Sequence, residues 1–135
     1  MSAYVITGGR RLNGSLDVQG SKNSVLPILA ATVLVNGKCI VHNCPKLSDT
    51  ECTIKILRSL GCGVRREGNT VTVDATTVSC SNIPEDLMRE MRSSIIFLGA
   101  LATKMGRARM CAPGGCELGN RPIDLHIKAL KQLGL

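Results

Sequence analysis

The strongest constraint on the fold of this chain is a short internal repeat. Residues 54–61 (IKILRSLG) match residues 127–134 (IKALKQLG) at an offset of 73. Upstream, the pair 37–38 matches the pair 106–107 at an offset of 69, so the second copy holds extra residues between these points. Such a repeat predicts two units of the same supersecondary type. The extra residues predict an enlarged loop at 113–121, where function tends to be carried.

The first unit is expected to run strand, helix, strand, helix, strand, strand. Pro27 is tolerated only in the first turn of a helix, so the first helix, over 24–35, should begin close to Asn23 or Ser24. Ser48 and Glu51 fit a capping box that starts the second helix, which ends at 61–63. Apolar alternation and turn residues predict strands at 4–7, 15–19, 38–43, 63–66 and 70–74.

The second unit repeats this order but stops early. A long helix is expected over 86–105, opened by Pro84 and Glu85, followed by a strand at 107–112 and a helix at 123–133. Counterparts of the two strands at 63–74 do not follow, because the sequence ends at Leu135. A helix without those strands would leave apolar surface uncovered. We therefore expect a fragment, a truncated product, or a piece that needs a partner.

Composition narrows the class of protein. The chain has 135 residues, 44% of them hydrophobic and 20% charged, which suits one globular domain. Its apolar runs fall short of a membrane span, and no secretion signal opens it. Seven cysteines are scattered without a common metal-ligand spacing, which predicts reduced thiols, most of them small buried hydrophobes. These features predict a soluble, cytoplasmic protein without a metal site.

The net charge of +7 suggests an anionic partner. Nucleic acid is disfavoured, because one Tyr, one Phe and no Trp leave almost no base-stacking surface. Most of the basic residues are expected to be solvated surface charges. A phosphorylated small molecule remains open.

Two segments carry residues suited to binding an anion. In the turn 20–23 (GSKN), Lys22 adds a full charge to the start of a helix, which already favours anions. Taken alone, a surface lysine beside a turn is the simpler interpretation. In the loop 113–122, Cys116 lies among glycines close to Arg121, which suits an exposed, reactive thiol. The competing interpretation is that Cys116 is an incidental loop cysteine. Arg92, taken alone, is expected to be a solvated arginine on the helix.

Together these residues resemble one family. Gly-Ser-Lys-Asn at 20–23, Met-Arg-Ser-Ser-Ile at 91–95, and Pro-Gly-Gly-Cys at 113–116, continuing to Arg121-Pro122 and Asp-Leu-His at 124–126, are similar to UDP-N-acetylglucosamine 1-carboxyvinyltransferases (enolpyruvyl transferases). The resemblance covers essentially the whole chain.

The resemblance implies a reaction and roles for particular residues. The reaction transfers enolpyruvyl from phosphoenolpyruvate to the 3′-hydroxyl of UDP-N-acetylglucosamine, releases phosphate, and begins peptidoglycan synthesis. Lys22, Asn23 and Arg121 would bind phosphoenolpyruvate, with Lys22 and Arg121 also catalytic, and Cys116 would be the proton donor. The UDP-sugar would be bound by Arg92, Arg121, Pro122, Ile123, Asp124 and Leu125, so Arg121 would contact both substrates. No cofactor, metal, nucleic acid or membrane is implied.

The implied fold is an α/β (α+β) inside-out barrel built from repeated βαβαββ units, truncated here within the second unit. Residues 1–20 would be strands that pack with a second domain, and 21–135 would be a partial first domain. The remainder of the enzyme chain would be a partner, and the isolated chain is expected to be inactive. The alternatives are a non-catalytic, truncated UDP-sugar-binding paralogue and an RNA-processing relative resembling the terminal phosphate cyclases. Within the superfamily, 5-enolpyruvylshikimate-3-phosphate synthase is the nearest rival.

Overall fold

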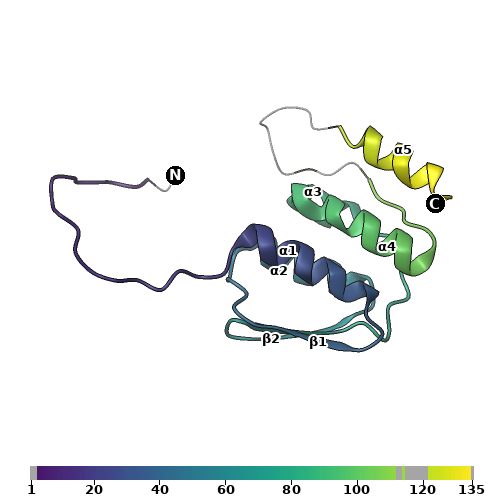
Figure 1. The fold of residues 1–135 in the computed structure, drawn as a ribbon, viewed down its shortest axis with the longest axis horizontal. Coiled ribbons are helices and arrows are strands. Elements are labelled where there is room, and N and C mark those ends of the chain that lie inside the picture. The colour runs from purple at the N-terminus through teal and green to yellow at the C-terminus, as the bar shows by residue number, and fades with distance from the viewer. Residues whose placement is uncertain (1–2, 112–113, 115–121, 135) are drawn as a thin grey trace.

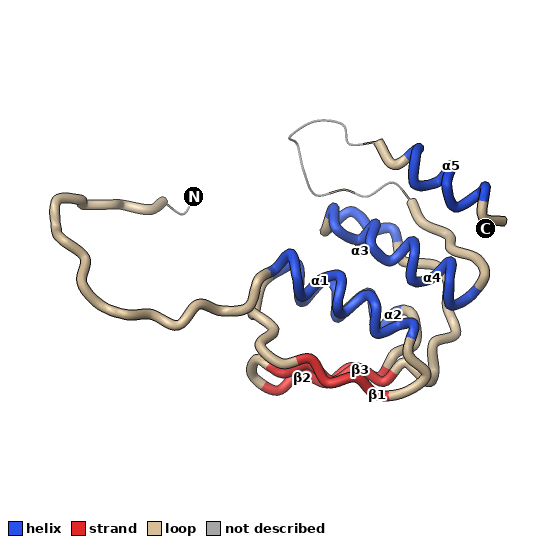
Figure 2. The backbone as a smooth tube through the Cα atoms, in the orientation of Figure 1, coloured by secondary structure: helices blue, strands red, loops and turns tan. Residues whose placement is uncertain are grey.

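Two helices and three antiparallel strands build the first unit. The computed structural model describes residues 3–111, 114 and 122–134. The elements of this unit are, in chain order, α1 (Lys22–Ala31), the 3₁₀ turn η1 (Thr32–Leu34), β1 (Lys38–Val41), α2 (Ser48–Ser59), β2 (Gly63–Glu67) and β3 (Thr70–Asp74). Strands pair in the order β1-β3-β2, and both helices lie on one face of the sheet (Figures 1 and 2). The predicted strands at 38–43, 63–66 and 70–74 are therefore confirmed, with small shifts in their ends.

The register of the sheet sets which side chains meet the helices. Val73 lies between Cys39 of β1 and Val64 of β2, and it is fully buried together with Val71 two residues earlier. Successive strand residues point to opposite faces, so Ile40 lies on the outer face and is 62% exposed. One face of the sheet therefore belongs to the core and the other meets solvent.

The core lies between this inner face and the helices. From α1 and α2 come side chains that are buried almost completely, and the second unit adds Phe97 and Leu101 to the same cluster. The helix contributions are Val25, Leu26, Leu29, Ile54, Ile56 and Leu57. Burial of side chains of this size stabilises by roughly 1.5–3 kcal/mol each relative to exposure, so this cluster fixes the position of α1 over α2.

The start of α2 differs from the predicted capping box. Ser48 is the first helical residue instead of the cap, the N-cap is Leu47, and no side chain caps the helix. The reason lies in tertiary contacts, because the Glu51 carboxylate lies 3.0 Å from Arg66 Nη1 of β2 instead of turning back to the helix start. Asp49 and Glu51 still place negative charge in the first turn, where the helix dipole favours it.

The long helix expected over 86–105 is wrong as a single element. It is broken into α3 (Glu85–Glu90), the 3₁₀ turn η2 (Arg92–Ile96) and α4 (Phe97–Met105), with Met91 extended at φ −141°, ψ 120°. The Met88 carbonyl, which an unbroken helix would pair with residue 92, instead accepts from Gly114 N (3.0 Å) and Ser94 Oγ (3.3 Å). A contact with a residue outside the helix therefore stabilises the break.

The strand expected at 107–112 is not formed as a ladder. Among the described residues, this segment makes one parallel bridge, Asn82 to Arg109, with Arg109 N donating to Ser81 O at 3.0 Å. The last element, α5 (Asp124–Gln132), confirms the helix predicted at 123–133 but buries none of its residues. The matching residues of α2, Ile54 and Leu57, are buried in the hydrophobic core.

The strands predicted at 4–7 and 15–19 are wrong for this structure. Residues 3–20 form an extended arm that leads away from the rest of the chain (Figure 1). Tyr4 is 98% exposed and Val18 is 86% exposed. A strand needs a neighbour to pair with its backbone groups, and no described segment lies along this arm. No helix among the described residues is both long and apolar enough to cross a membrane.

We expect the stability of the fold to fall at alkaline pH through two buried thiols. Burial raises the pKa of Cys52 and of Cys62 to about 11 each, helped by Glu90 and Asp74 respectively, whereas an unfolded thiol has a pKa near 9.0. The resulting stabilisation is complete below pH 9 and is lost as the pH rises towards 11. Urea unfolding at pH 8 and pH 10.5 should therefore show a loss of about 1–2 kcal/mol for each thiol.

The double variant Cys52→Ala/Cys62→Ala is the control for other groups that titrate in this range. It will be less stable at pH 8 because buried volume is lost. Its further loss between pH 8 and pH 10.5 should be smaller than that of the unchanged protein. An equal loss in both proteins would show that these thiols do not carry the pH dependence.

Candidate functional site

The entry to α1 is held in place by a close backbone approach at Gly20. A Cβ placed there would overlap the carbonyl oxygen of Asn43, so only glycine fits. Asn43 has a left-handed backbone (φ 56°), a conformation that Asn tolerates better than most residues. Next to it, Cys44 N donates to Asn69 O (2.7 Å) and Cys44 O accepts from Arg66 Nη2 (2.8 Å), so the loop is tied to the sheet.

Lys22 is thereby placed at the first position of α1, beside the first turn of α2. Its Nζ lies 2.8 Å from Oδ2 of Asp49, and the two side chains are 47% and 25% exposed. The other oxygen of Asp49 accepts from Ser48 Oγ at 3.5 Å. The two helices thus begin at the same end of the unit (Figure 2), where their free backbone N–H groups and dipoles favour an anion.

Asn23 follows Lys22 on the exposed side of α1. The helix begins at Lys22, within one residue of the predicted start, but Pro27 is its sixth residue and not part of the first turn, so that placement is wrong. Because Pro27 has no N–H, the carbonyl of Asn23 lacks its usual donor four residues on. Asn23 therefore brings an exposed amide side chain, and a carbonyl without its α-helical i+4 donor, to the end of α1 next to Lys22.

Arg92 is placed by the break between α3 and η2. It is the first residue of η2, is half-buried, and engages other groups of the protein. Gly114 lies against this break, since its N–H bonds Met88 O and a Cβ on it would overlap the backbone of Arg89. Gly114 is thus held against the C-terminal part of α3, just before Arg92 in the sequence.

Four further predicted residues lie at the start of α5. Pro122 and Asp124 are exposed, Leu125 is 72% exposed, and Ile123 is half-buried. Cys116 and Arg121 lie outside the described residues. The structure therefore brings Lys22 and Asn23 together at one helix end and places Arg92 on η2, which packs against α1.

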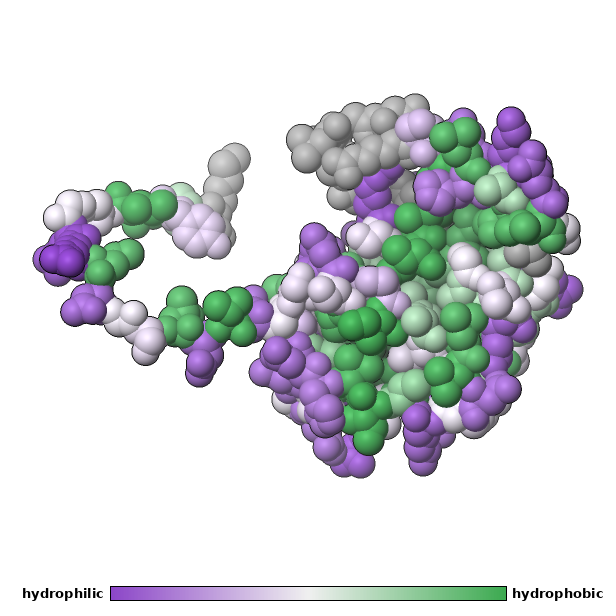
Figure 3. Space-filling model, in the orientation of Figure 1, coloured by the Kyte–Doolittle hydropathy of each residue, from purple (hydrophilic) through white to green (hydrophobic). Residues whose placement is uncertain are grey.

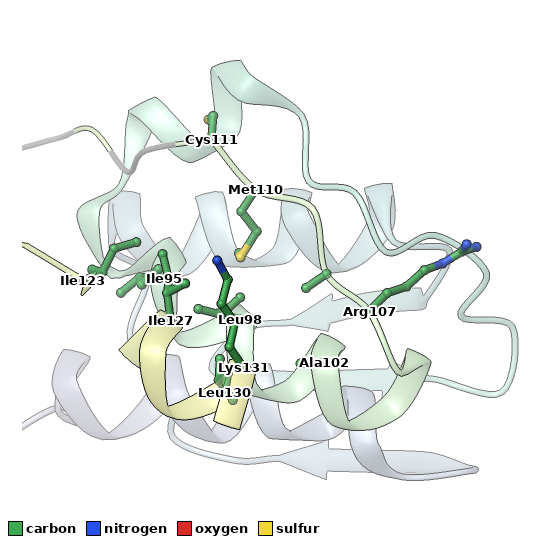
Figure 4. A pocket seen from close by; sticks show the side chains of 11 residues that line it. Ile95, Leu98, Ala102, Arg107, Met110, Cys111, Ile123, Ile127, Leu130 and Lys131 are labelled. Carbon is green, nitrogen blue, oxygen red and sulfur yellow. The ribbon is translucent and has the colours of Figure 1, made fainter. Parts of the chain in front are cut away.

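A cavity of about 450 Å³ lies elsewhere, within the second unit, between α5 on one side and α4 with residues 107–111 on the other (Figure 4). Its lining is mostly apolar, with Ile95 and Leu98 on one side and Ile127 and Leu130 of α5 on the other, and Arg107 and Lys131 add charge. Of the predicted site residues that the structure describes, only Ile123 lines it. In the first unit, the matching residues Ile54 and Leu57 of α2 are buried in the core. We therefore interpret the cavity as a packing gap of the second unit.

Metal binding finds no support in the described part of the chain, where no three His, Cys, Asp or Glu side chains cluster. The described cysteines are all free thiols. The residue that sequence reasoning missed is Asp49, the ion-pair partner of Lys22. Its position in the first turn of α2 was visible in the sequence, but its contact with α1 depends on how the two helices pack.

Substitution of Gly20 tests whether the close approach fixes α1. Gly20→Ala forces the backbone at Asn43 to move, and overpacking of this kind costs about 1–3 kcal/mol. Urea unfolding should show this loss. Gly8→Ala in the exposed arm is the matched control, because a Cβ there has no neighbour within 4 Å. Equal stability of the two variants would contradict the close approach.

Comparison with known proteins gives a consistent result. The sequence model described as EPSP synthase (3-phosphoshikimate 1-carboxyvinyltransferase) matches residues 6–135. UDP-N-acetylglucosamine 1-carboxyvinyltransferase 2 of Caldanaerobacter subterraneus subsp. tengcongensis is 51% identical over 135 residues, which are 100% of this chain and 32% of the relative. UDP-N-acetylglucosamine 1-carboxyvinyltransferase of Methylacidiphilum infernorum is 48% identical over 134 residues, which are 99% of this chain and 32% of that relative.

A solved structure agrees with the sequence relatives. The enolpyruvyl transferase NikO from Streptomyces tendae superposes with a TM-score of 0.67 at 31% identity, over 75% of this chain and 24% of that one. The predicted enolpyruvyl-transferase resemblance and fold are confirmed, and these matches favour carboxyvinyltransferases over an RNA-processing protein. The chain spans about a third of the length of the curated relatives it matches. This chain belongs to the EPSP synthase (3-phosphoshikimate 1-carboxyvinyltransferase) family.

Proposed function

We propose that this chain supplies the N-terminal part of an enzyme that transfers enolpyruvyl from phosphoenolpyruvate to the 3′-hydroxyl of UDP-N-acetylglucosamine. The product would enter peptidoglycan synthesis, and phosphate would be released. The observation that carries the proposal is the placement of Lys22 where α1 and α2 begin, in a chain 51% identical to a UDP-N-acetylglucosamine 1-carboxyvinyltransferase. A cytoplasmic location is part of the proposal, supported by the free thiols of the described cysteines.

Electrostatics would bind phosphoenolpyruvate. Lys22 and Arg121 neutralise its phosphate and carboxylate, and the planar fork of Arg121 suits paired oxygens. Asn23 orients the reacting groups from the adjacent position of α1. The exposure of Lys22, 47%, leaves its ammonium accessible to a ligand.

The UDP-sugar would be held by two segments that flank the cysteine loop. Arg92 approaches from η2, and Arg121 with residues 122–125 approaches from the start of α5. Backbone N–H groups at the start of α5 favour the anionic diphosphate. The contact of Gly114 with Met88 and Arg89 supports this arrangement, because it holds Gly114 against the helix that precedes Arg92.

Cys116 would act as the proton donor in the first of two steps. The sugar hydroxyl gives its proton to a general base and adds to C2 of phosphoenolpyruvate, while the thiol gives its proton to the methylene carbon, forming a tetrahedral ketal. Loss of a proton from the new methyl group and departure of phosphate then restore the double bond. Nearby cations favour thiolate, and the bound phosphate offsets them so that the thiol stays protonated.

Turnover is expected to need more than this chain. The resemblance places the general base and another phosphate-binding arginine in the part of the relatives that the chain does not cover. A phosphate-release assay with both substrates should therefore show no activity for the purified 135-residue chain. Clear turnover would contradict this assignment of the missing groups.

Alkylation by fosfomycin, an epoxide phosphonate, tests the proposed site directly. The sulfur of Cys116 opens the epoxide and forms a C–S bond as its proton passes to the epoxide oxygen, while Lys22 and Arg121 hold the phosphonate. Mass spectrometry should show one adduct, at Cys116, that Lys22→Gln reduces several-fold. Cys52 and Cys62 serve as internal controls, because their burial and pKa values of about 11 make them poor nucleophiles near pH 8. Uniform labelling of all seven cysteines would count against the site.

A further inference from the structure

Asp49 occupies the position of a resident counter-ion at the proposed anion site. Its Oδ2 lies 2.8 Å from Lys22 Nζ, closer than Lys55 lies to its partner Glu90 (3.2 Å). Two acidic residues in the first turn of α2 make different ion pairs: Asp49 with Lys22 of α1, and Glu51 with Arg66 of β2.

Stability alone does not account for this pair. Both side chains reach solvent, at 47% and 25% exposure, and ion pairs of this kind contribute about 0–1 kcal/mol. The backbone around Asp49 is held independently, because Asp49 O accepts a hydrogen bond from the buried Thr53 Oγ1 at 2.9 Å. Removal of the carboxylate charge therefore leaves the fold intact and changes the electrostatics of the site.

Without Asp49, the site would attract anions indiscriminately. The ammonium of Lys22 lies where the dipoles of two helices add positive potential, so inorganic phosphate alone would find a favourable place. A carboxylate in contact with the ammonium both competes for its N–H donors and repels an incoming anion. Only a ligand with further contacts overcomes that repulsion.

We propose that Asp49 is the counter-ion of Lys22 that sets the anion affinity of this site, so that isolated inorganic anions bind it only weakly. The proposal rests on the proposed function, because it assigns the anion site to Lys22. An incoming phosphorylated carboxylate replaces Asp49 as acceptor for some of the N–H donors of the Lys22 ammonium. Ser48 Oγ remains beside Oδ1 of Asp49.

Trace acetylation of the full 135-residue chain with acetic anhydride tests this, with each lysine quantified by mass spectrometry and inorganic phosphate as the probe. Phosphate bound at Lys22 slows acetylation of that residue. Asp49→Asn keeps the size of the side chain and removes its charge. The phosphate concentration that half-protects Lys22 should fall about three- to tenfold in this variant at low salt, and the difference should shrink at 1 M salt.

Glu90→Gln is the matched control. It removes the charge from the Lys55–Glu90 pair, so it should change acetylation of Lys55 and leave the phosphate midpoint at Lys22 unchanged. An unchanged or higher midpoint in Asp49→Asn overturns the proposal, as does the absence of phosphate protection in both proteins. A higher midpoint would mean that Asp49 mainly orients Lys22.

Phosphoenolpyruvate, added in a second series, separates this proposal from the proposed function. Protection of Lys22 by phosphoenolpyruvate in the unchanged chain supports both. A lowered phosphate midpoint in Asp49→Asn without any protection by phosphoenolpyruvate contradicts the proposed function, while the counter-ion role of Asp49 towards inorganic anions stands.

Discussion

The apolar face that α1 and α2 share with the sheet determines where the candidate site lies. Val71 and Val73 of β3 are fully buried, in one hydrophobic cluster with side chains of both helices. The two helices therefore lie on one face of the sheet and begin at the same end of it (Figure 2). The Lys22–Asp49 ion pair is a consequence of that packing, since its partners are 27 residues apart in the sequence but adjacent across the helix ends.

The two repeat units show what the same sequence pattern does with and without its strands. Ile54 and Leu57 are buried in the core that includes β3, whereas Ile127 is 39% exposed at the matching position of α5. Apolar residues also gather over the outward side of α1 and α4 (Figure 3), where Ile28 is 50% exposed. Large apolar surface of this kind is typical of a face covered by further structure.

Much of the first unit follows from local sequence. The alternation in 63–74 with its Gly68 turn, and the apolar stripe of α2, have their partners within the described chain, so pattern and structure agree. The break at Met91 could not be predicted, because it depends on a hydrogen bond from Gly114 to Met88. The capping box failed for a similar reason, since Arg66 engages Glu51. At the site, motif residues predicted Lys22 and Asn23, whereas Asp49 emerged only from helix packing.

Backbone amide NMR of the chain during titration with phosphoenolpyruvate measures the location of the anion site most directly. The account predicts that the largest shift changes fall on residues 20–23 and 48–50, where α1 and α2 begin, while the residues lining the cavity beneath α5 change little. Largest changes around that cavity, at Ile127 and Leu130, would contradict it. So would the absence of any change at Lys22 and Asp49.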